Sequence, residues 1–328
     1  MALNIRIHET GGPEVLQAED IDPGAPGTGE VRLRNTAIGL NYIDVYFRTG
    51  QYKGPDLPFT LGLEGAGVVE AVGAGVTEFQ PGDRVAYCSP PLGSYAAERI
   101  YPAEKLVHLP PEIDEQTAAA AMLKGLTAQY LLRRTHPIKA GDTILIHAAA
   151  GGVGLIVCQW AKALGATVIG TVGSPEKAEL ARQHGCDHPI LYKEEDLVER
   201  VRAITNGEGV PVVYDSVGRD TFMQSLDCLR VRGHMVCFGL SSGQVEPLDI
   251  GILAAKGSLS VTRPTLFSYI GTREELVAAA AELFAVIADG RVHIRIGSTF
   301  PLAEAALAHR ALEARQTTGS TVLLPEAD

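Results

Sequence analysis

The chain has 328 residues, 46% of them hydrophobic, which is enough for two ordinary domains with a sizeable buried core. Its 28 Lys and Arg residues are outnumbered by 39 Asp and Glu residues, giving a formal net charge of −11. Since the basic residues are also scattered, a broad nucleic-acid surface is not expected. No apolar run reaches the ~18 residues of a membrane span, and the N-terminus has no signal-peptide core, so we expect a soluble, cytoplasmic chain.

Five cysteines are spread through the chain without any C-x-x-C pair: Cys88, Cys158, Cys186, Cys228 and Cys237. An odd number at irregular spacing argues against a disulfide framework and against a structural zinc lobe. We therefore expect buried, reduced thiols.

Residues 1–123 carry short alternating runs that are interrupted by glycine and proline. The clearest runs cover residues 30–40, 65–76, 82–88 and 105–111. Alternation of apolar and polar residues between turn-forming residues is typical of half-buried strands. This region is therefore predicted to be an irregular, mostly β domain.

Residues 124–264 change to alternating strands and helices. Nearly continuous apolar runs predict buried strands at 142–150, 166–172, 188–192, 210–218 and 233–240, with helices at 151–165, 174–185, 194–207 and 220–231. Such alternation produces a doubly wound parallel sheet. This part is therefore predicted to be an α/β domain of the Rossmann type.

The C-terminal region returns to a mixed pattern. Helices are predicted at 272–290 and 301–314, followed by a strand at 320–325. We therefore predict a discontinuous first domain, residues 1–123 and 265–328, with the Rossmann domain, residues 124–264, inserted in it.

A glycine-rich turn follows the first predicted strand of the Rossmann domain. The sequence "HAAAGGVG", residues 147–154, matches G-x-G-x-x-G with Ala149 in place of the first glycine. Gly151 and Gly152 would let the backbone approach a pyrophosphate, and Gly154 would allow close packing of helix on strand. The N-terminus of the helix adds free N–H groups and a positive dipole. The pattern predicts a dinucleotide site.

The tip of the next strand lacks the carboxylate that binds the ribose hydroxyls in NAD-dependent domains. It reads "TVGSPEK", with Gly173 and Ser174 where an acid would be expected. Ser174 is a good N-cap, whereas Lys177 in the first helical turn opposes the helix dipole. Together they can hold a 2′-phosphate, and Tyr192 at the following strand tip can cover the adenine. The pattern predicts NADPH; the alternative is that Lys177 is only a solvated charge.

Several segments, spread over nearly the whole chain, resemble the medium-chain dehydrogenase/reductase superfamily. They include "GGPEVL", "AIGLNYIDVYFRTGQY", "LGLEGAGVVEAVGAGV", "LKGLTAQYLL", "HAAAGGVGLIVCQWAKALGA" and "VVYDSVGRDTF". Within the superfamily, the chain is similar to the zinc-free NADPH:quinone reductases of the zeta-crystallin type. The resemblance implies an N-terminal GroES-like β domain, a Rossmann domain and a cleft between them.

Zinc-dependent members of this superfamily bind a catalytic metal through Cys, His and Cys. The matching positions here hold Asn41, Leu63 and Lys124. Leu63 has no donor atom, and Lys124 is cationic at neutral pH. Glu64 is a single carboxylate, and the segment that replaces the four-cysteine structural lobe contains Cys88 alone. We therefore expect neither a catalytic nor a structural zinc.

The segment "NYIDVYFRTGQY" stands at the cleft position that the resemblance implies. Tyr46 and Tyr52 could stack on a flat quinone or nicotinamide, and a tyrosine hydroxyl could donate to a developing oxyanion. Strict alternation would place Tyr42, Asp44 and Tyr46 on one face, which is not a clean core pattern. Tyr42 and Tyr46 are also expected to contact the cofactor. Asn41 and Lys124 could hydrogen-bond substrate or cofactor. The alternatives are ordinary aromatic packing and, for Lys124, pairing with a carboxylate.

The resemblance implies further cofactor residues, position by position. They are Thr127 and Tyr130 on the helix facing the cofactor, Gly152 and Val153 at the pyrophosphate, Ser216, Phe238 and Ser241 at the nicotinamide, and Arg263 and Arg315 closing around the dinucleotide. Two other polar residues are expected to be structural. His147 should be a satisfied core histidine, and Asp215 a loop-fixing acid.

We therefore expect an NADPH-dependent quinone oxidoreductase that transfers hydride directly from nicotinamide to a quinone, without metal or flavin. One alternative is an NADPH-dependent enoyl or alkenal reductase, which can use a tyrosine at the position of Tyr52 as proton donor. Another is a non-catalytic RNA-binding or structural protein of the crystallin kind. Residues 256–262, "KGSLSVT", could be the edge strand through which this family pairs, so a homodimer is expected.

Overall fold

The structure is a computed structural model that describes residues 1–325 and divides into two compact units. Unit 1 comprises Met1–Leu126, Ile270–Ala288 and the residues from Ile294 onward; unit 2 comprises Thr127–Tyr269 and Asp289–His293. The first division lies within helix α2 (Glu115–Tyr130). Both main divisions fall a few residues later than the boundaries predicted after residues 123 and 264.

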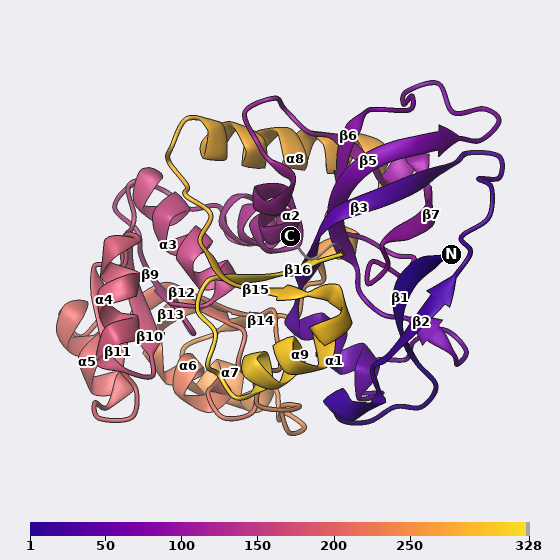
Figure 1. Cartoon of the computed structure of the whole chain (residues 1–328). Coiled ribbons are helices and arrows are strands. Elements are labelled where there is room, and N and C mark those ends of the chain that lie inside the picture. Colours follow the sequence, from indigo (N-terminus) through magenta and orange to yellow (C-terminus); the bar gives the residue numbers. More distant parts are fainter. Residues whose placement is uncertain (326–328) are drawn as a thin grey trace. The chain divides into compact units, whose positions relative to one another are not determined.

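Unit 1 is built on two sheets (Figure 1). The larger has the order β15-β16-β3-β5-β6-β8, with β7 also paired to β3. Its strands are β3 (Glu30–Leu40), β5 (Glu64–Val72), β6 (Arg84–Tyr87), β7 (Glu98–Pro102), β8 (Val107–His108), β15 (Ile296–Pro301) and β16 (Ser320–Leu324). The smaller sheet, in the order β2-β1-β4, contains β1 (Ala2–Ile7), β2 (Gln17–Ile21) and β4 (Phe59–Thr60). The predicted alternation is confirmed along β3, where Val31, Leu33 and Ala37 are fully buried.

Helices cover parts of these sheets. Those of unit 1 are α1 (Tyr42–Arg48), the first part of α2, α8 (Arg273–Ala288), α9 (Ala305–Glu313) and the short turns η1 (Pro13–Val15), η2 (Ala103–Lys105) and η5 (Leu302–Glu304). The C-terminal helices and the final strand β16 are confirmed, whereas β15 was not predicted. Helix α9 lies beside β15 and η1.

The segment after β3 corrects one prediction: residues 42–48 form a helix instead of an extended strand. Asn41 is its N-cap, and the Asn41 N–H donates to Asp44 Oδ2 at 2.9 Å, which is the reach-back half of a capping box. Gly50 follows the helix with φ +77°, a conformation that glycine adopts without strain. The apolar residues at 43, 45 and 47 alternate as in a strand, but the Asn41-x-x-Asp44 capping box stabilises the start of a helix.

Unit 2 is the predicted Rossmann domain, with a six-stranded parallel sheet in the order β11-β10-β9-β12-β13-β14. Its strands are β9 (Thr143–Ile146), β10 (Thr167–Val172), β11 (His188–Leu191), β12 (Val210–Asp215), β13 (Leu229–Cys237) and β14 (Ser260–Thr262). The helical elements are η3 (Leu131–Thr135), α3 (Gly152–Ala163), α4 (Pro175–Gln183), α5 (Leu197–Ile204), α6 (Phe222–Cys228), α7 (Gly251–Ala255) and η4 (Leu266–Ser268). Strand order reverses between β9 and β12, which places a ligand crevice at their carboxyl ends.

The core of unit 2 follows from its apolar strands. Ile144, Leu145 and Ile146 on β9 are fully buried, and Trp160 on α3 is 1% exposed, as its packing role requires. All five cysteines are buried thiols. Within residues 1–325, no helix is both long enough and apolar enough to cross a bilayer.

The packing of α3 on β9 predicts the effect of Gly154→Ala. A Cβ at this position would lie 2.3 Å from the Ala148 carbonyl oxygen and 2.7 Å from the Ala149 carbonyl oxygen. Because backbone atoms cannot move aside cheaply, we expect the free energy of unfolding to fall by about 1–3 kcal/mol.

Urea denaturation at equilibrium measures this loss. The control is Gly251→Ala at the start of α7, where the nearest atom is Asp249 Oδ1 at 3.2 Å. That variant should be unchanged, or stabilised by up to about 1 kcal/mol through helix propensity. Equal effects in the two variants would contradict the packing argument.

Candidate functional site

The glycine turn of unit 2 places backbone N–H groups at the start of α3. Gly151 is the N-cap, and its N–H donates to the Ala148 carbonyl at 2.9 Å, while Ala148 itself has φ +55°. Gly152 and Val153 follow in the first turn, where N–H groups have no acceptor within the helix. The turn can therefore present N–H groups and the helix dipole to an anion such as a pyrophosphate.

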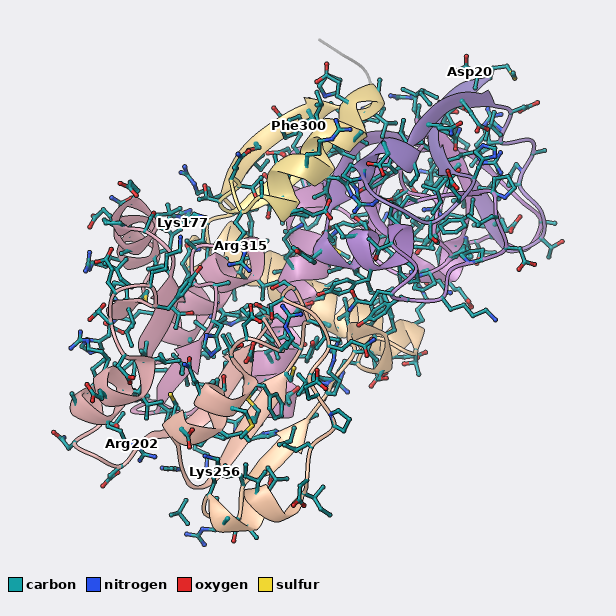
Figure 2. The ribbon with its side chains drawn as sticks, turned by 90° about the horizontal axis from the view of Figure 1, so that it is seen from below. Asp20, Lys177, Arg202, Lys256, Phe300 and Arg315 are labelled. Carbon is teal, nitrogen blue, oxygen red and sulfur yellow. The ribbon has the colours of Figure 1, made fainter. Side chains whose placement is uncertain are left out.

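The tips of β10 and β11 bring together four of the predicted cofactor residues. Ser174 is the N-cap of α4, and its Oγ accepts the Lys177 N–H at 3.4 Å. Figure 2 shows Lys177 on α4. Tyr192 is 42% exposed, and a Cβ at Gly173 would come within 3.0 Å of its hydroxyl oxygen. Gly173, Ser174 and Lys177, which are half-buried, therefore form one cluster with the exposed Tyr192.

An acid does lie beside this cluster, although not at the strand tip. A hydrogen bond from the Ser174 side chain lowers the pKa of the exposed Glu176 carboxyl below its usual value. Glu176 therefore competes with any anion for the Ser174 hydroxyl. The positive charge at this tip comes from Lys177 and from the helix dipole.

The loops after β12 and β13 join three more predicted residues. The Ser241 N–H donates to the Ser216 carbonyl at 3.1 Å, and the Phe238 N–H donates to the Asp215 carbonyl at 2.8 Å. Asp215 is fully buried, and its carboxylate accepts the Val217 and Gly218 N–H groups at 2.7 and 3.0 Å. Its expected role as a loop-fixing acid is confirmed.

His147 is a satisfied core histidine, as expected. Its ring contacts Thr171 Oγ1 at 3.0 Å and Ser225 Oγ at 2.9 Å, and Ser225 also donates to Asp215 Oδ2 at 3.0 Å. Burial lowers the pKa of His147 below its usual value, so the ring is neutral near pH 7. The bonds tie β9 to β10 and α6.

The end of α2 carries a stacked tyrosine pair. The rings of Tyr130 and Tyr269 lie 4.5 Å apart at an interplanar angle of 10°. Burial raises the pKa of Tyr130, while the nearby Arg263 charge lowers it, so the arginine lies close to this ring. Thr127, one turn earlier on α2, is also buried. These three predicted residues therefore occupy one region of unit 2.

In unit 1, two of the three positions that match zinc ligands, Asn41 and Lys124, are joined through the buried Glu64 carboxylate. Asn41 Nδ2 donates to Glu64 Oε2 at 2.7 Å, and the Leu123 N–H donates to Oε1 at 2.6 Å. Lys124 Nζ lies 3.4 Å from Oε2 and 3.1 Å from the Leu40 carbonyl oxygen. The carboxylate pairing of Lys124 is therefore present.

These side chains do not fit a zinc ion. Leu63 supplies no donor, Lys124 is held as a cation beside a carboxylate, and the Asn41 amide is already bonded to Glu64. Within residues 1–325, no three His, Cys, Asp or Glu side chains converge as a possible metal site.

Three tyrosines form a contiguous aromatic cluster in unit 1. The Tyr42 and Tyr46 ring centroids are 5.5 Å apart, and those of Tyr46 and Tyr52 are 5.0 Å apart. The Tyr52 N–H donates to the Tyr46 carbonyl at 2.9 Å, which folds the segment after α1 back onto the helix. Tyr42 and Tyr46 share a face because they are four residues apart on a helix, and not because they alternate on a strand.

Arg315 lies in unit 1, after α9, with φ +58° (Figure 2). Burial and Glu313 raise the pKa of Tyr42, while Arg315 lowers it, which places the arginine near the tyrosine cluster. Arg263, its predicted companion, lies in unit 2.

Sequence reasoning missed the buried residues behind α1. Tyr95 donates to Asp44 Oδ2 at 3.0 Å and contacts His309 Nε2 at 3.0 Å, and His309 Nδ1 lies 2.9 Å from Arg48 Nη1. Burial raises the pKa of Asp44 to about 7. The Asn41–Asp44 spacing was the available signal, because it marks a helix start.

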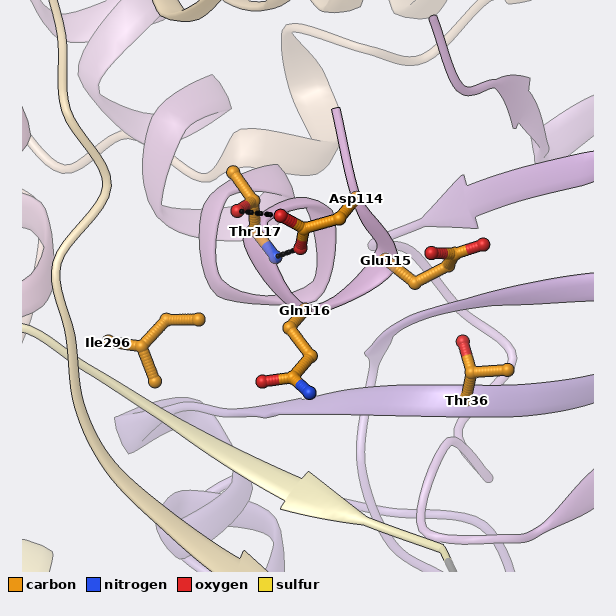
Figure 3. Close-up of a pocket in the computed structure, with 6 residues that line it drawn as sticks. All are labelled: Thr36, Asp114, Glu115, Gln116, Thr117 and Ile296. Atoms are coloured by element: carbon orange, nitrogen blue, oxygen red, sulfur yellow. Dashed lines mark hydrogen bonds between the residues drawn. The ribbon is translucent and has the colours of Figure 1, made fainter. Parts of the chain in front are cut away.

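A surface hollow of about 480 Å³ in unit 1 holds none of the candidate residues (Figure 3). It is lined by Thr36, Asp114, Glu115, Gln116, Thr117 and Ile296. Asp114 is already occupied, since it accepts the Thr117 N–H at 2.7 Å and the Thr117 hydroxyl at 3.0 Å.

Two family patterns match the chain. The alcohol dehydrogenase GroES-like domain matches residues 27–111, and the zinc-binding dehydrogenase family matches residues 152–285. The second description names zinc, although the donor set described above does not suit that metal.

Proteins similar to this chain match it over its full length. A quinone oxidoreductase of Pseudomonas aeruginosa is 59% identical over 325 residues, covering 99% of this chain and 100% of that protein. A 2-haloacrylate reductase of a Burkholderia species is 50% identical over 336 residues, covering 100% of both. The crystal structure of Escherichia coli quinone oxidoreductase complexed with NADPH has a TM-score of 0.97 at 53% identity, covering 99% of this chain and 100% of that one. The chain therefore belongs to the quinone oxidoreductase family of the medium-chain dehydrogenase/reductase superfamily.

Proposed function

We propose that the protein is an NADPH:quinone oxidoreductase that transfers hydride directly to a quinone, without metal or flavin. The observation that carries the proposal is the 59% identity, over essentially its whole length, to a quinone oxidoreductase. The Ser174–Lys177 cluster, which has no acid at the strand tip, supports NADPH over NADH. When bound, NADPH supplies the hydride, and the protein supplies binding and orientation.

The residues of unit 2 are proposed to bind the cofactor. Gly151, Gly152 and Val153 would direct N–H groups at the pyrophosphate, and Ser174 with Lys177 would hold the 2′-phosphate. Gly173 leaves room beside Tyr192, which would cover the adenine. The remaining proposed cofactor contacts are Thr127, Tyr130, Ser216, Phe238, Ser241 and Arg263 in unit 2, and Tyr42, Tyr46 and Arg315 in unit 1.

The residues of unit 1 are proposed to receive the quinone. Tyr52, which is half-buried, and Tyr46, which is 6% exposed, would contact a flat ring, and their hydroxyl groups are candidate donors to the oxygen that gains negative charge. Asn41, which precedes Tyr42, and Lys124, which donates to the Leu40 carbonyl, would provide an amide and a cation to substrate or cofactor. Because aromatisation drives quinone reduction, the reaction does not require a strong Lewis acid.

A second function, reduction of an activated C=C bond, is favoured by one observation. The 2-haloacrylate reductase is 50% identical over the whole chain. Such a reaction adds hydride to one carbon and a proton to its neighbour, so it needs a proton donor placed at carbon. Tyr52 is the candidate donor.

The protein is also proposed to form a cytoplasmic homodimer. The support is that β14 is the edge strand of the six-stranded sheet, where its backbone groups can pair with a second copy. The net charge of −11 weighs against the RNA-binding alternative.

The proposed reaction predicts that NADPH is oxidised by 1,4-benzoquinone much faster than NADH is. The rate should be unchanged by EDTA, because no metal takes part. Initial rates followed by absorbance of the reduced cofactor, with both cofactors side by side, measure this. Equal rates would contradict the assignment of the strand tip, and inhibition by EDTA would contradict metal-free transfer.

Removal of the proposed phosphate-binding charge should narrow the cofactor preference. In Lys177→Ala, we expect the KM for NADPH to rise by about 10- to 150-fold, equivalent to about 1.5–3 kcal/mol for a charged hydrogen bond, with little change for NADH. Arg182→Ala is the matched control, because it removes an exposed charge from the last turn of the same helix. A similar rise in both variants would indicate only a general loss of positive field.

The variant Tyr52→Phe separates the two candidate reactions. It keeps the aromatic contacts with Tyr46 and Phe47 but removes the hydroxyl. Reduction of 2-chloroacrylate, if the enzyme performs it, should fall by about 10²- to 10⁴-fold, as expected for loss of a general acid. Quinone reduction should fall much less. Steady-state kinetics with both acceptors measure this, and an equally large loss with quinone would assign Tyr52 as a proton donor in that reaction as well.

A further inference from the structure

Helix α1 is held from behind by a closed ring of buried side chains. Asp44 and Arg48, both on α1, are linked through Tyr95, in the loop between β6 and β7, and His309 on α9. Asp44, Tyr95 and His309 are 0% exposed, and Arg48 is 1% exposed. Arg48 also donates to both carboxylate oxygens of Glu313, at 2.8 and 2.9 Å. The ring therefore joins α1 to α9 and to the β6–β7 loop.

The direction of every hydrogen bond in this ring is fixed by Arg48. A guanidinium only donates, so His309 Nδ1 must accept, and the ring proton of neutral His309 lies on Nε2. Nε2–H then donates to the Tyr95 oxygen, and the Tyr95 O–H donates to Asp44 Oδ2. Burial and the Arg48 charge lower the pKa of His309 to about 3, which agrees with a neutral ring. His309 therefore cannot accept a proton at Nδ1, and the ring of hydrogen bonds provides no path for protons from the surface.

The ring and the tyrosine cluster occupy opposite faces of the same helix. At about 100° per residue, Asp44 and Arg48 lie about 40° apart around the helix axis, whereas Tyr42 and Tyr46 lie about 120–160° away from them. One face of α1 carries the hydrogen bonds of the ring, and the other carries Tyr46, which is 6% exposed and contacts both Tyr42 and Tyr52. Any movement of the held face is therefore passed directly to the tyrosines.

We propose that Tyr95 and His309 are positioning residues: through Asp44 and Arg48 they fix the orientation of α1, and with it the tyrosines that would contact the substrate. The same Asp44 oxygen that accepts from Tyr95 also accepts the Asn41 N–H at 2.9 Å, so the ring sets the start of the helix as well. The inference rests on the proposed function of the tyrosine cluster.

Asp44 is the group through which pH acts on this ring. Its Oδ2 accepts two hydrogen bonds, whereas its buried Oδ1 has no hydrogen-bond partner within residues 1–325. Burial, with a smaller contribution from the Glu64 charge, raises the pKa of Asp44 to about 7. Three groups oppose this rise: the Asn41 N–H and Tyr95 hydroxyl through hydrogen bonds, and Lys124 through its charge. The other charged or titratable groups of the ring are His309, Arg48 and Glu313. Since a carboxylate accepts more strongly than a carboxylic acid, α1 should be held more firmly above about pH 7.

The test compares Tyr95→Phe, Asp44→Asn and a matched control, Tyr87→Phe. Tyr87 is also fully buried and donates one hydrogen bond, to Asn35 Oδ1 at 3.0 Å, but it has no bond to the ring. Both Phe variants should lose a similar amount of stability, about 2–4 °C in Tm. Only Tyr95→Phe should raise the KM for 1,4-naphthoquinone, by about tenfold.

The pH dependence of kcat/KM distinguishes a positioning role from a purely structural one, because a general loss of stability would not shift its midpoint. In the wild type, kcat/KM should rise with pH through a midpoint near 7. In Tyr95→Phe the midpoint should move to higher pH, because the carboxylate has lost a donor, and in Asp44→Asn it should be absent. Tyr87→Phe should keep the wild-type midpoint. If Tyr95→Phe matches Tyr87→Phe in KM and in midpoint, the proposal is overturned.

A binding measurement separates this inference from the proposed reaction. If the wild-type protein does not oxidise NADPH with any quinone, the proposed function fails. The naphthoquinone Kd, measured by calorimetry on the NADP⁺-loaded protein, then decides the positioning role without turnover. A rise in Kd in Tyr95→Phe alone supports it, and equal Kd values in the two Phe variants, or no quinone binding by the wild type, overturn it.

Discussion

The candidate site of unit 1 depends on one buried carboxylate. Glu64 is 0% exposed and accepts hydrogen bonds from the Asn41 amide, the Leu123 N–H and the Lys124 ammonium. These donors come from the end of β3 and from α2, so a single side chain on β5 joins three elements. Gly39 makes this possible, because a Cβ there would lie 2.2 Å from Glu64 Oε2. Removing one partner of such a buried pair costs about 3–5 kcal/mol, so Lys124 has a structural role.

The arrangement explains how the same strand and helix ends serve different chemistry within one superfamily. Where relatives use zinc ligands, this chain has the Asn41 amide and the Lys124 cation, which both bind Glu64, and the apolar side chain of Leu63. A permanent positive charge can stabilise a developing oxyanion, but it cannot polarise a carbonyl as strongly as a divalent metal. This favours acceptors whose reduction is already strongly driven.

The sequence predicted the strongly periodic parts well. Continuous apolar strands, the glycine turn and the Ser174–Pro175 helix start are local signals, and the structure confirms each of them. The sequence did not reveal α1, because the apolar pattern of residues 42–48 is compatible with both a strand and a helix. The ring behind α1 also left no pattern, since Tyr95 and His309 are brought together by tertiary packing across 214 positions of sequence. Such contacts arise from the whole fold and not from local spacing.

The fixed polarity of that ring bears on which reaction suits the site. Because Arg48 blocks His309 Nδ1, a proton consumed in the reaction cannot be supplied through Asp44 from the surface of α9. The remaining candidate sources are a tyrosine hydroxyl, the Lys124 ammonium and solvent. Reduction of a quinone produces oxyanions, which solvent protonates readily, whereas reduction of a C=C bond requires protonation at carbon and so a well-placed acid. The site has aromatic side chains, a fixed cation and a rigid helix, but no buried proton pathway through Asp44. It therefore suits reduction of quinones better than reduction of C=C bonds.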